Sequence, residues 1–287
     1  MTLSSESPLA SLAEAQPELA AYPQARASLP PGEIAEGAYA VRYAASVEEL
    51  DAILRLRFDV FNIELSEGLE ESFATGRDQD EFDAQCHHLL VEHRPTGRVI
   101  GTYRIQTAAM ARATRGFYTA TEFDLSRLPE EIVAQSVEVG RACIAVEHRL
   151  KPVLFLLWKG LALYMAHNQK RFLFGPCSLT SQDPWDGKRV LDYLEQKDLV
   201  RKDVEVGAMP GYECIWTGED PAPEKGERIE LPPLFDIYLR YAGRTCGPPV
   251  IDRRFKTIDF FILFDVDALS SRARRLSPRC RRRRTDW

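Results

Sequence analysis

An antiparallel hairpin in the middle of the chain is the feature that most limits its fold. Two apolar segments, 87–93 and 98–107, are joined by the turn Arg94-Pro95-Thr96-Gly97. Such a short, glycine-containing connection is typical of neighbouring antiparallel strands. Further strand-like segments alternate with helix-like ones, which predicts a mixed α/β sheet flanked by helices rather than a doubly wound parallel sheet.

The other expected elements follow from local patterns. The capping box Ser46-Val47-Glu48-Glu49 begins a helix that continues to Phe61, and Pro152 begins a second helix that ends near Gln169. A third helix is expected over 185–195. The remaining strands are expected over 39–43, 137–145, 171–179 and 257–265.

Composition divides the chain into three parts. Residues 1–38 are rich in Ala, Pro, Ser and Glu, and they predict a disordered leader without a secretory signal. Residues 39–270 are expected to form one domain, with a surface loop over 217–230. Residues 271–287 form an arginine-rich tail on an otherwise acidic chain, which suggests contact with an anionic membrane surface; a solvated tail without function is the alternative. No nucleic-acid partner is predicted.

The expected location is the cytoplasm, at or near the inner face of the membrane. The six cysteines stand far apart and include no Cys-x-x-Cys pair, which favours reduced thiols. The most apolar helical segment, 153–166, is shorter than the roughly 20 residues that span a bilayer.

Charged residues interrupt segments that otherwise have the character of a core. They comprise Arg57, which shares a helix face with Phe61, and Asp80, Asp83, Arg104, Glu138 and Arg141. A buried charge without a partner is costly, so such residues either form ion pairs or line a cleft. Arg57 and Arg104 could therefore pair with Asp80 and Asp83 or hold the carboxylate of a ligand.

Glu138 is the strongest candidate for a catalytic or substrate-binding group, with a structural ion pair as the alternative. Glu138 and Arg141 point to opposite faces of a regular strand, and a bulge at Gly140 would change this and expose backbone N–H groups to a substrate carbonyl. No metal is predicted, since adjacent His87 and His88 point in opposite directions. Motifs for a serine nucleophile, a Walker phosphate loop or a dinucleotide fold are absent from the sequence.

Four segments together resemble the charged signatures of the acyl-homoserine-lactone synthases. They are Leu56-Arg57-Phe58-Asp59-Val60-Phe61, Asp80-Glu81-Phe82-Asp83, Gly101-Thr102-Tyr103-Arg104 and Glu138-Val139-Gly140-Arg141. A tryptophan that those synthases carry shortly after the helix is missing here. The chain more closely resembles the ornithine lipid-synthesising L-ornithine N(alpha)-acyltransferases. That resemblance rests on Cys86-His87-His88-Leu89-Leu90-Val91, Gly116-Phe117-Tyr118, Glu122-Phe123-Asp124, Leu157-Trp158-Lys159-Gly160-Leu161, Gly175-Pro176-Cys177-Ser178-Leu179 and Phe255-Lys256-Thr257-Ile258-Asp259-Phe260.

The resemblance implies a GNAT-type acyltransferase fold and transfer of a 3-hydroxyacyl group from acyl carrier protein to the α-amine of ornithine, forming lyso-ornithine lipid. Glu138 would be the general base, and backbone N–H groups near Gly140 would stabilise the oxyanion. Substrate contacts are expected from Arg57, Phe61, Asp80, Asp83, Arg104, Gly140 and Arg141.

The expected donor is the phosphopantetheine thioester of the carrier protein, without a further cofactor. GNAT enzymes that use coenzyme A hold its pyrophosphate with a glycine-bearing loop, whereas segment 146–152 has no glycine. His148, Arg149 and Lys151 of that segment are expected to contact the phosphate or the carrier. Two alternatives are synthesis of an acyl-homoserine lactone or another N-acyl amino acid, and a non-catalytic protein that binds acyl chains or the carrier.

Overall fold

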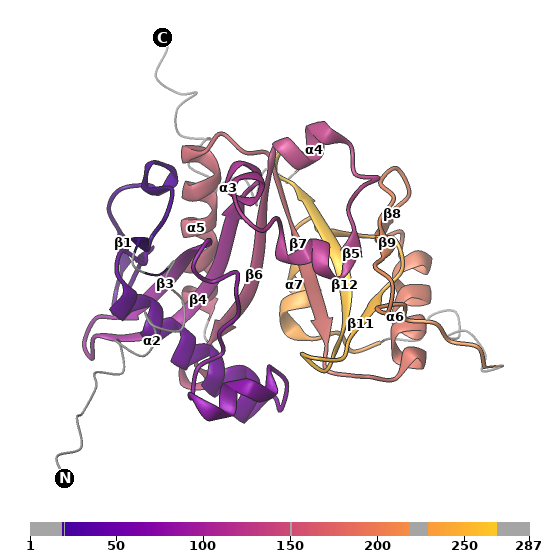
Figure 1. Cartoon of the computed structure of the whole chain (residues 1–287), viewed down its shortest axis with the longest axis horizontal. Helices are drawn as coiled ribbons and strands as arrows, with labels where there is room; N and C mark the ends of the chain where they lie inside the picture. Colours follow the sequence, from indigo (N-terminus) through magenta and orange to yellow (C-terminus); the bar gives the residue numbers. More distant parts are fainter. Residues whose placement is uncertain (1–18, 20, 150, 219–228, 269–287) are drawn as a thin grey trace.

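The computed structural model describes residues 19, 21–149, 151–218 and 229–268. Its centre is a ten-stranded mixed sheet in the order β1-β2-β3-β4-β6-β7-β12-β10-β8, with β11 paired to β12. Figure 1 shows β6 and β7 side by side in the middle, with the earlier strands on one side and β12 on the other. In the described chain the pairs β6–β7 and β8–β10 are parallel and the other pairs of this sheet are antiparallel. The prediction of a mixed, mostly antiparallel sheet is confirmed.

The strands of the large sheet are β1 (Ile34–Glu36), β2 (Tyr39–Tyr43), β3 (His87–His93), β4 (Arg98–Thr107), β6 (Ser136–Ile144), β7 (Phe172–Leu179), β8 (Val200–Arg201), β10 (Arg244–Cys246), β11 (Val250–Asp252) and β12 (Thr257–Asp265). A small second sheet pairs β5 (Phe123–Asp124) with β9 (Gly207–Ala208). The α-helices are α2 (Val47–Phe58), α3 (Ala108–Ala113), α4 (Glu130–Ala134), α5 (Lys151–His167), α6 (Pro184–Gln196) and α7 (Pro233–Arg240).

The expected elements lie within a few residues of the observed ones. Helix α2 begins as predicted, because the Ser46 hydroxyl accepts a hydrogen bond from the Glu49 N–H. It continues as one π-helical segment, Asp59–Glu64, which carries Phe61. The sequence patterns did not identify α7 or the short strands β8 to β11.

The domain begins earlier than the sequence suggests. Residues 21–38 are part of the fold, since Tyr22 is buried with its hydroxyl hydrogen-bonded to Nδ1 of His88 at 3.0 Å, and β1 pairs with β2. The prediction of a disordered leader up to residue 38 is therefore wrong for this part, because a few apolar contacts and a strand pairing outweigh a polar composition. Residues 1–18 and the arginine-rich tail lie outside the described residues.

Helices cover both faces of the first half of the sheet. Helix α5 packs on the face that carries Leu89, whose methyl groups lie so close to Gly160 that a Cβ on the glycine would meet them at 2.6 Å. Helix α2 covers the opposite face, where its Leu50 joins a core cluster with Leu90. Among the described residues, no helix has the length and apolarity needed to cross a lipid bilayer.

A β-bulge on β6 changes the direction of its side chains. Thr102 on β4 pairs with Cys143 and Arg104 pairs with Gly140, so β6 holds one extra residue between these positions. Arg141 takes the left-handed conformation, with φ of 49°, so the bulge is present where predicted, although the residue with positive φ is not the expected Gly140. The shift brings Arg141 to the face that carries Glu138.

Strands β6 and β7 stay paired for only a short distance. Their parallel register joins Ser136, Val137 and Glu138 to residues 172–174 and ends there. Gly175 still lies close to β6, since a Cβ at this position would be 2.0 Å from the Val139 carbonyl oxygen. The next residue, Pro176, has no N–H to donate to a ladder. The centre of the sheet therefore separates directly beyond Glu138, as Figure 1 shows.

Candidate active site

Glu138 lies at the point where β6 and β7 separate. Its carboxylate accepts hydrogen bonds from the backbone N–H groups of Thr119 at 2.7 Å and Tyr118 at 3.2 Å. Burial raises the pKa of Glu138 above its ordinary value, although these two donors and the charge of Arg104 act against the rise. A carboxylate with a raised pKa and backbone donors on one side is suited to accept a proton from its open side.

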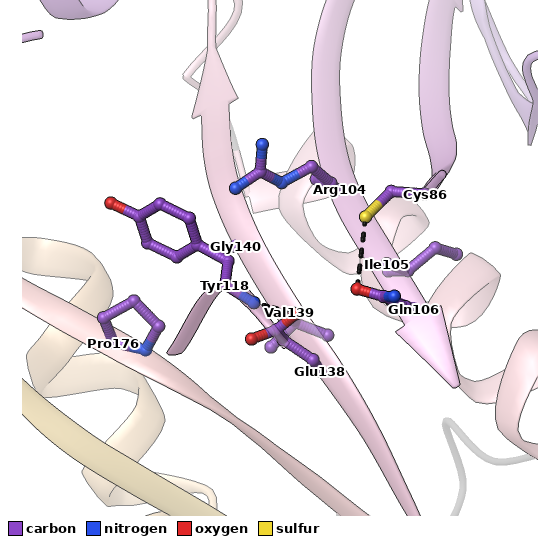
Figure 2. Close-up of a pocket in the computed structure, with 9 residues that line it drawn as sticks. All are labelled: Cys86, Arg104, Ile105, Gln106, Tyr118, Glu138, Val139, Gly140 and Pro176. Atoms are coloured by element: carbon purple, nitrogen blue, oxygen red, sulfur yellow. Dashed lines mark hydrogen bonds between the residues drawn. The ribbon is translucent and has the colours of Figure 1, made fainter. Parts of the chain in front are cut away.

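A small cavity opens beside this carboxylate, and Figure 2 shows the side chains around it. The cavity is lined by Cys86, Arg104, Ile105, Gln106, Tyr118, Glu138, Val139, Gly140 and Pro176. When the Gln106 amide is turned so that its oxygen accepts from Gln85, its nitrogen donates to Oε2 of Glu138 at 3.3 Å. The cavity thus brings together three of the predicted site residues: Glu138, Gly140 and Arg104.

Two arginines enclose the Tyr118 ring. The guanidinium carbon of Arg104 lies 4.9 Å from the ring centroid, and that of Arg141 lies at 4.7 Å. Arg141 also lies 4.4 Å from the centroid of Phe255, whose ring packs edge-on against Phe61. These cation–π contacts hold Tyr118 over the cavity.

Behind the cavity lies the arginine–aspartate cluster, which comprises Arg57, Asp78, Asp80, Asp83, Arg104 and Arg141. Arg57 is fully buried. It donates to Asp78 and to Asp83, in each case at 2.6 Å. The guanidinium of Arg57 is therefore occupied by protein carboxylates and does not line the cavity. Of the two possibilities that the sequence left open for Arg57, pairing with an aspartate is the one present here, with Asp83 as the partner.

The front of this cluster faces the cavity. Arg104 donates to both oxygens of Asp80, at 2.6 and 2.7 Å, and Arg141 donates to the same carboxylate at 3.0 Å. Burial raises the pKa of Asp83, but the charges of Arg57 and Arg104 outweigh it and hold that pKa well below its ordinary value. The lowered pKa values of Asp80 and Asp83 keep these two carboxylates ionised, and Asp80 fixes the two arginines that enclose Tyr118.

The residues predicted to meet the donor lie between the end of β6 and the first residue of α5. Arg149 is exposed and forms a double ion pair with Glu64, at 2.5 and 2.6 Å, while its Nε donates to the Ile144 carbonyl. His148 is hydrogen-bonded to the Tyr39 hydroxyl at 3.1 Å. The backbone of Lys151 begins α5, and its side chain is outside the described part. Glu64, to which the sequence assigned no role, thus orients Arg149.

Several residues around the site were not identified from the sequence. Asp78 lies in a loop where acidic residues are ordinary, and no local signal separates it from its neighbours. Tyr118 follows a turn in a segment without periodicity. Asp259, by contrast, interrupts an apolar strand as Glu138 does, and the same criterion would have selected it.

Comparisons with known proteins show the family of this chain. A family model described as an acetyltransferase (GNAT) domain matches residues 56–159. The chain is 32% identical over 248 residues to an L-ornithine N(alpha)-acyltransferase of Brucella abortus, covering 82% of this chain and 87% of that protein. It is also 32% identical to one from Rhizobium meliloti, covering 80% and 81%. The acyl-homoserine-lactone synthase LasI superposes with a TM-score of 0.44 at 12% identity, covering 84% of this chain and 95% of LasI. The chain is therefore an acyltransferase with a GNAT domain, and it belongs to the L-ornithine N(alpha)-acyltransferase family.

Proposed function

We propose that the protein transfers a 3-hydroxyacyl group from acyl carrier protein to the α-amine of L-ornithine and so forms lyso-ornithine lipid. The observation that carries the proposal is the position of Glu138, a buried carboxylate with a raised pKa at the point where the sheet separates, in a chain 32% identical to an L-ornithine N(alpha)-acyltransferase. The family supports ornithine as the acceptor, and the burial and hydrogen bonds of Glu138 support this carboxylate as the place of the chemistry.

In the proposed reaction the α-amine nitrogen attacks the thioester carbonyl carbon while Glu138 takes a proton from the amine, directly or through water. The C–N bond forms and the C–S bond breaks, and the departing thiolate takes up the proton that Glu138 received. An extra residue in a bulge is left out of the regular ladder, so the backbone N–H groups around Gly140 and Arg141 are placed to stabilise the oxyanion.

We propose the phosphopantetheine arm of acyl carrier protein as the donor. Segment 146–152 leads into α5 and includes its first two residues, and backbone N–H groups at the start of a helix bind a phosphate. Exposed Arg149 adds a charge that suits the acidic surface of a carrier.

Replacing Arg149 by glutamate is expected to raise the KM for acyl carrier protein on the order of tenfold and to leave the KM for the acceptor unchanged. The matched control is Arg127→Glu, which reverses another exposed arginine that is paired with a glutamate, Glu205. Steady-state kinetics at two salt concentrations measure both constants. Equal effects of the two substitutions would show that Arg149 does not meet the donor.

The decisive experiment for the function is an assay of the purified protein with 3-hydroxyacyl carrier protein and L-ornithine, followed by mass spectrometry. Parallel reactions contain glutamine, tyrosine or S-adenosylmethionine. A product with ornithine alone supports the proposal, whereas a lactone from S-adenosylmethionine supports the alternative of a homoserine-lactone synthase. Binding of the thioester without turnover with any acceptor would support a non-catalytic role.

We also propose that the protein acts in the cytoplasm, next to the anionic inner face of the membrane. Eight arginines stand between positions 272 and 284, and each basic residue near such a surface contributes about 1 kcal/mol of attraction. Removal of residues 279–287 is expected to weaken co-sedimentation with vesicles that contain anionic lipid, and not with neutral vesicles. Equal sedimentation of the full-length and the truncated protein would show that the tail does not bind the membrane and would support a solvated tail without function.

A further inference from the structure

Three buried carboxylates converge from separate parts of the chain. Glu122 directly precedes β5, Asp252 ends β11, and Asp259 lies on β12. One oxygen of each lies within 4.8 Å of the others, and these residues are 1%, 4% and 3% exposed. We call them the carboxylate cluster.

The carboxylate cluster lacks the compensation that the arginine–aspartate cluster has. Asp252 accepts two backbone N–H bonds and Asp259 accepts one from the Thr257 hydroxyl. Oε2 of Glu122 and Oδ1 of Asp259 are buried without a hydrogen-bond partner. Within the described residues, no arginine or lysine forms an ion pair with any of the three.

Repulsion between the carboxylates contributes to raised pKa values of Asp259 and Glu122. Burial raises the pKa of Asp259 to about 6, and the neighbouring Asp252 adds to the rise while Ser178, Thr257 and Arg141 act against it. Burial, together with Asp259 and Asp252, also raises the pKa of Glu122 well above its ordinary value. A cation bound among these carboxylates would remove the repulsion.

Tyr118 connects the carboxylate cluster to the catalytic carboxylate. Its backbone N–H donates to Glu138 at 3.2 Å, and its hydroxyl donates to Asp252 at 3.4 Å. Figure 2 shows the ring extending away from Glu138, with the hydroxyl at its far end. The two acidic sites are thus linked by one tyrosine residue with a hydrogen bond at each end, and an extended diamino acid likewise presents an amine at each end of its chain.

We propose that Glu122, Asp252 and Asp259 bind the side-chain ammonium group of the acceptor amino acid while its α-amine lies at Glu138. This inference rests on the proposed function, because it assigns a binding site to the acceptor of that reaction. It also gives a basis for selectivity. An amino acid without the second ammonium group would leave the buried carboxylates unpaired, and a site built to bind a polar group discriminates strongly against a ligand that lacks it.

An ammonium group fits the cluster better than a divalent cation. It has three N–H donors, which match one oxygen from each of three carboxylates. Calcium and magnesium take about six or more oxygen ligands in regular geometry. Here both oxygens of Asp252 and one of Asp259 already accept hydrogen bonds from the protein.

The test compares L-ornithine with L-norvaline, which has the same carbon chain without the terminal amine. The substitutions are Glu122→Gln and Asp259→Asn, and the control is Asp265→Asn on the same strand, where the lost carboxylate pairs with Arg171. The measured quantity is the ratio of kcat/KM for ornithine to that for norvaline, which does not depend on the fraction of protein that is folded.

We expect the wild type and Asp265→Asn to prefer ornithine by on the order of 10², and the two cluster variants to lose most of this preference through a higher KM for ornithine. An unchanged ratio in both cluster variants would overturn the inference. A parallel loss of activity toward both amino acids, with the ratio preserved, would also overturn it and leave the carboxylates a structural role.

Calorimetric titrations separate this inference from the proposed function. If the wild type acylates neither amino acid, the proposed function fails, and stronger binding of ornithine than of norvaline, lost in Asp259→Asn, would still support the site. Equal binding of the two amino acids would overturn it. Binding of Mn²⁺ by the wild type and not by the variants, with ornithine preference abolished by a chelator, would assign the cluster to a metal and overturn the ammonium site.

Discussion

Replacement of Glu138 by glutamine lowers the rate of acyl transfer by a factor on the order of 10²–10⁴, because the amide cannot take the proton that the attacking amine loses. The change is nearly isosteric, and one side-chain oxygen remains to accept from the Thr119 N–H at 2.7 Å. The effect is therefore expected in kcat rather than in the KM for the acceptor. Initial rates with saturating donor and acceptor measure it.

The control for this substitution is Glu205→Gln, an exposed carboxylate that pairs with Arg127. It should leave both the rate and the unfolding midpoint unchanged. A fully active Glu138→Gln enzyme would mean that Glu138 only positions the 118–119 backbone. A fall in rate that is matched by an equal fall in the fraction of folded protein would lead to the same conclusion.

Replacement of Arg57 by alanine is expected to lower the free energy of unfolding by about 3–5 kcal/mol, the typical result of removing one partner from a buried ion pair. Arg57 is fully buried, and its loss leaves Asp78 and Asp83 without the cation that each contacts at 2.6 Å. Urea unfolding, monitored by circular dichroism at pH 7, measures the change.

The control is Arg55→Ala on the same helix, whose exposed side chain pairs with Asp51 and should contribute less than about 1 kcal/mol. The effect of Arg57→Ala should also depend on pH. In the wild type the lowered pKa of Asp83 stabilises the fold above its unfolded value of about 4, and this contribution is lost as the pH falls through the folded pKa. The difference between variant and wild type should therefore shrink in acid. A difference below about 1 kcal/mol at pH 7 would contradict the prediction.

Local patterns predicted the parts of the fold that depend on neighbouring residues. The hairpin of β3 and β4, the capped start of α2 and strand β12 follow from turn chemistry, capping and a nearly continuous apolar run, and each lies where it was expected. The sequence left open whether Arg104 pairs with Asp80. The observed pairing follows from the cost of an unpaired buried charge, which is also the reason why both residues were selected as candidates.

The remaining parts depend on contacts between distant segments. Asp252 and Asp259 meet Glu122 only after β11, β12 and the loop before β5 have been assembled, and no spacing in the sequence records that meeting. The bulge could be anticipated from Glu138 and Arg141, but its left-handed residue could not. There the ion pairs and ring contacts of Arg141 outweigh the preference of glycine for positive φ.

The short junction between β6 and β7 has a consequence for acceptor length. Glu138 lies on one side of this junction and Asp259 on the other, and parallel pairing joins the two strands at only three positions. The angle at which the strands diverge therefore determines the distance between Glu138 and the carboxylate cluster. Substitutions at the junction, remote from any reacting atom, would change which diamino acid fits between them.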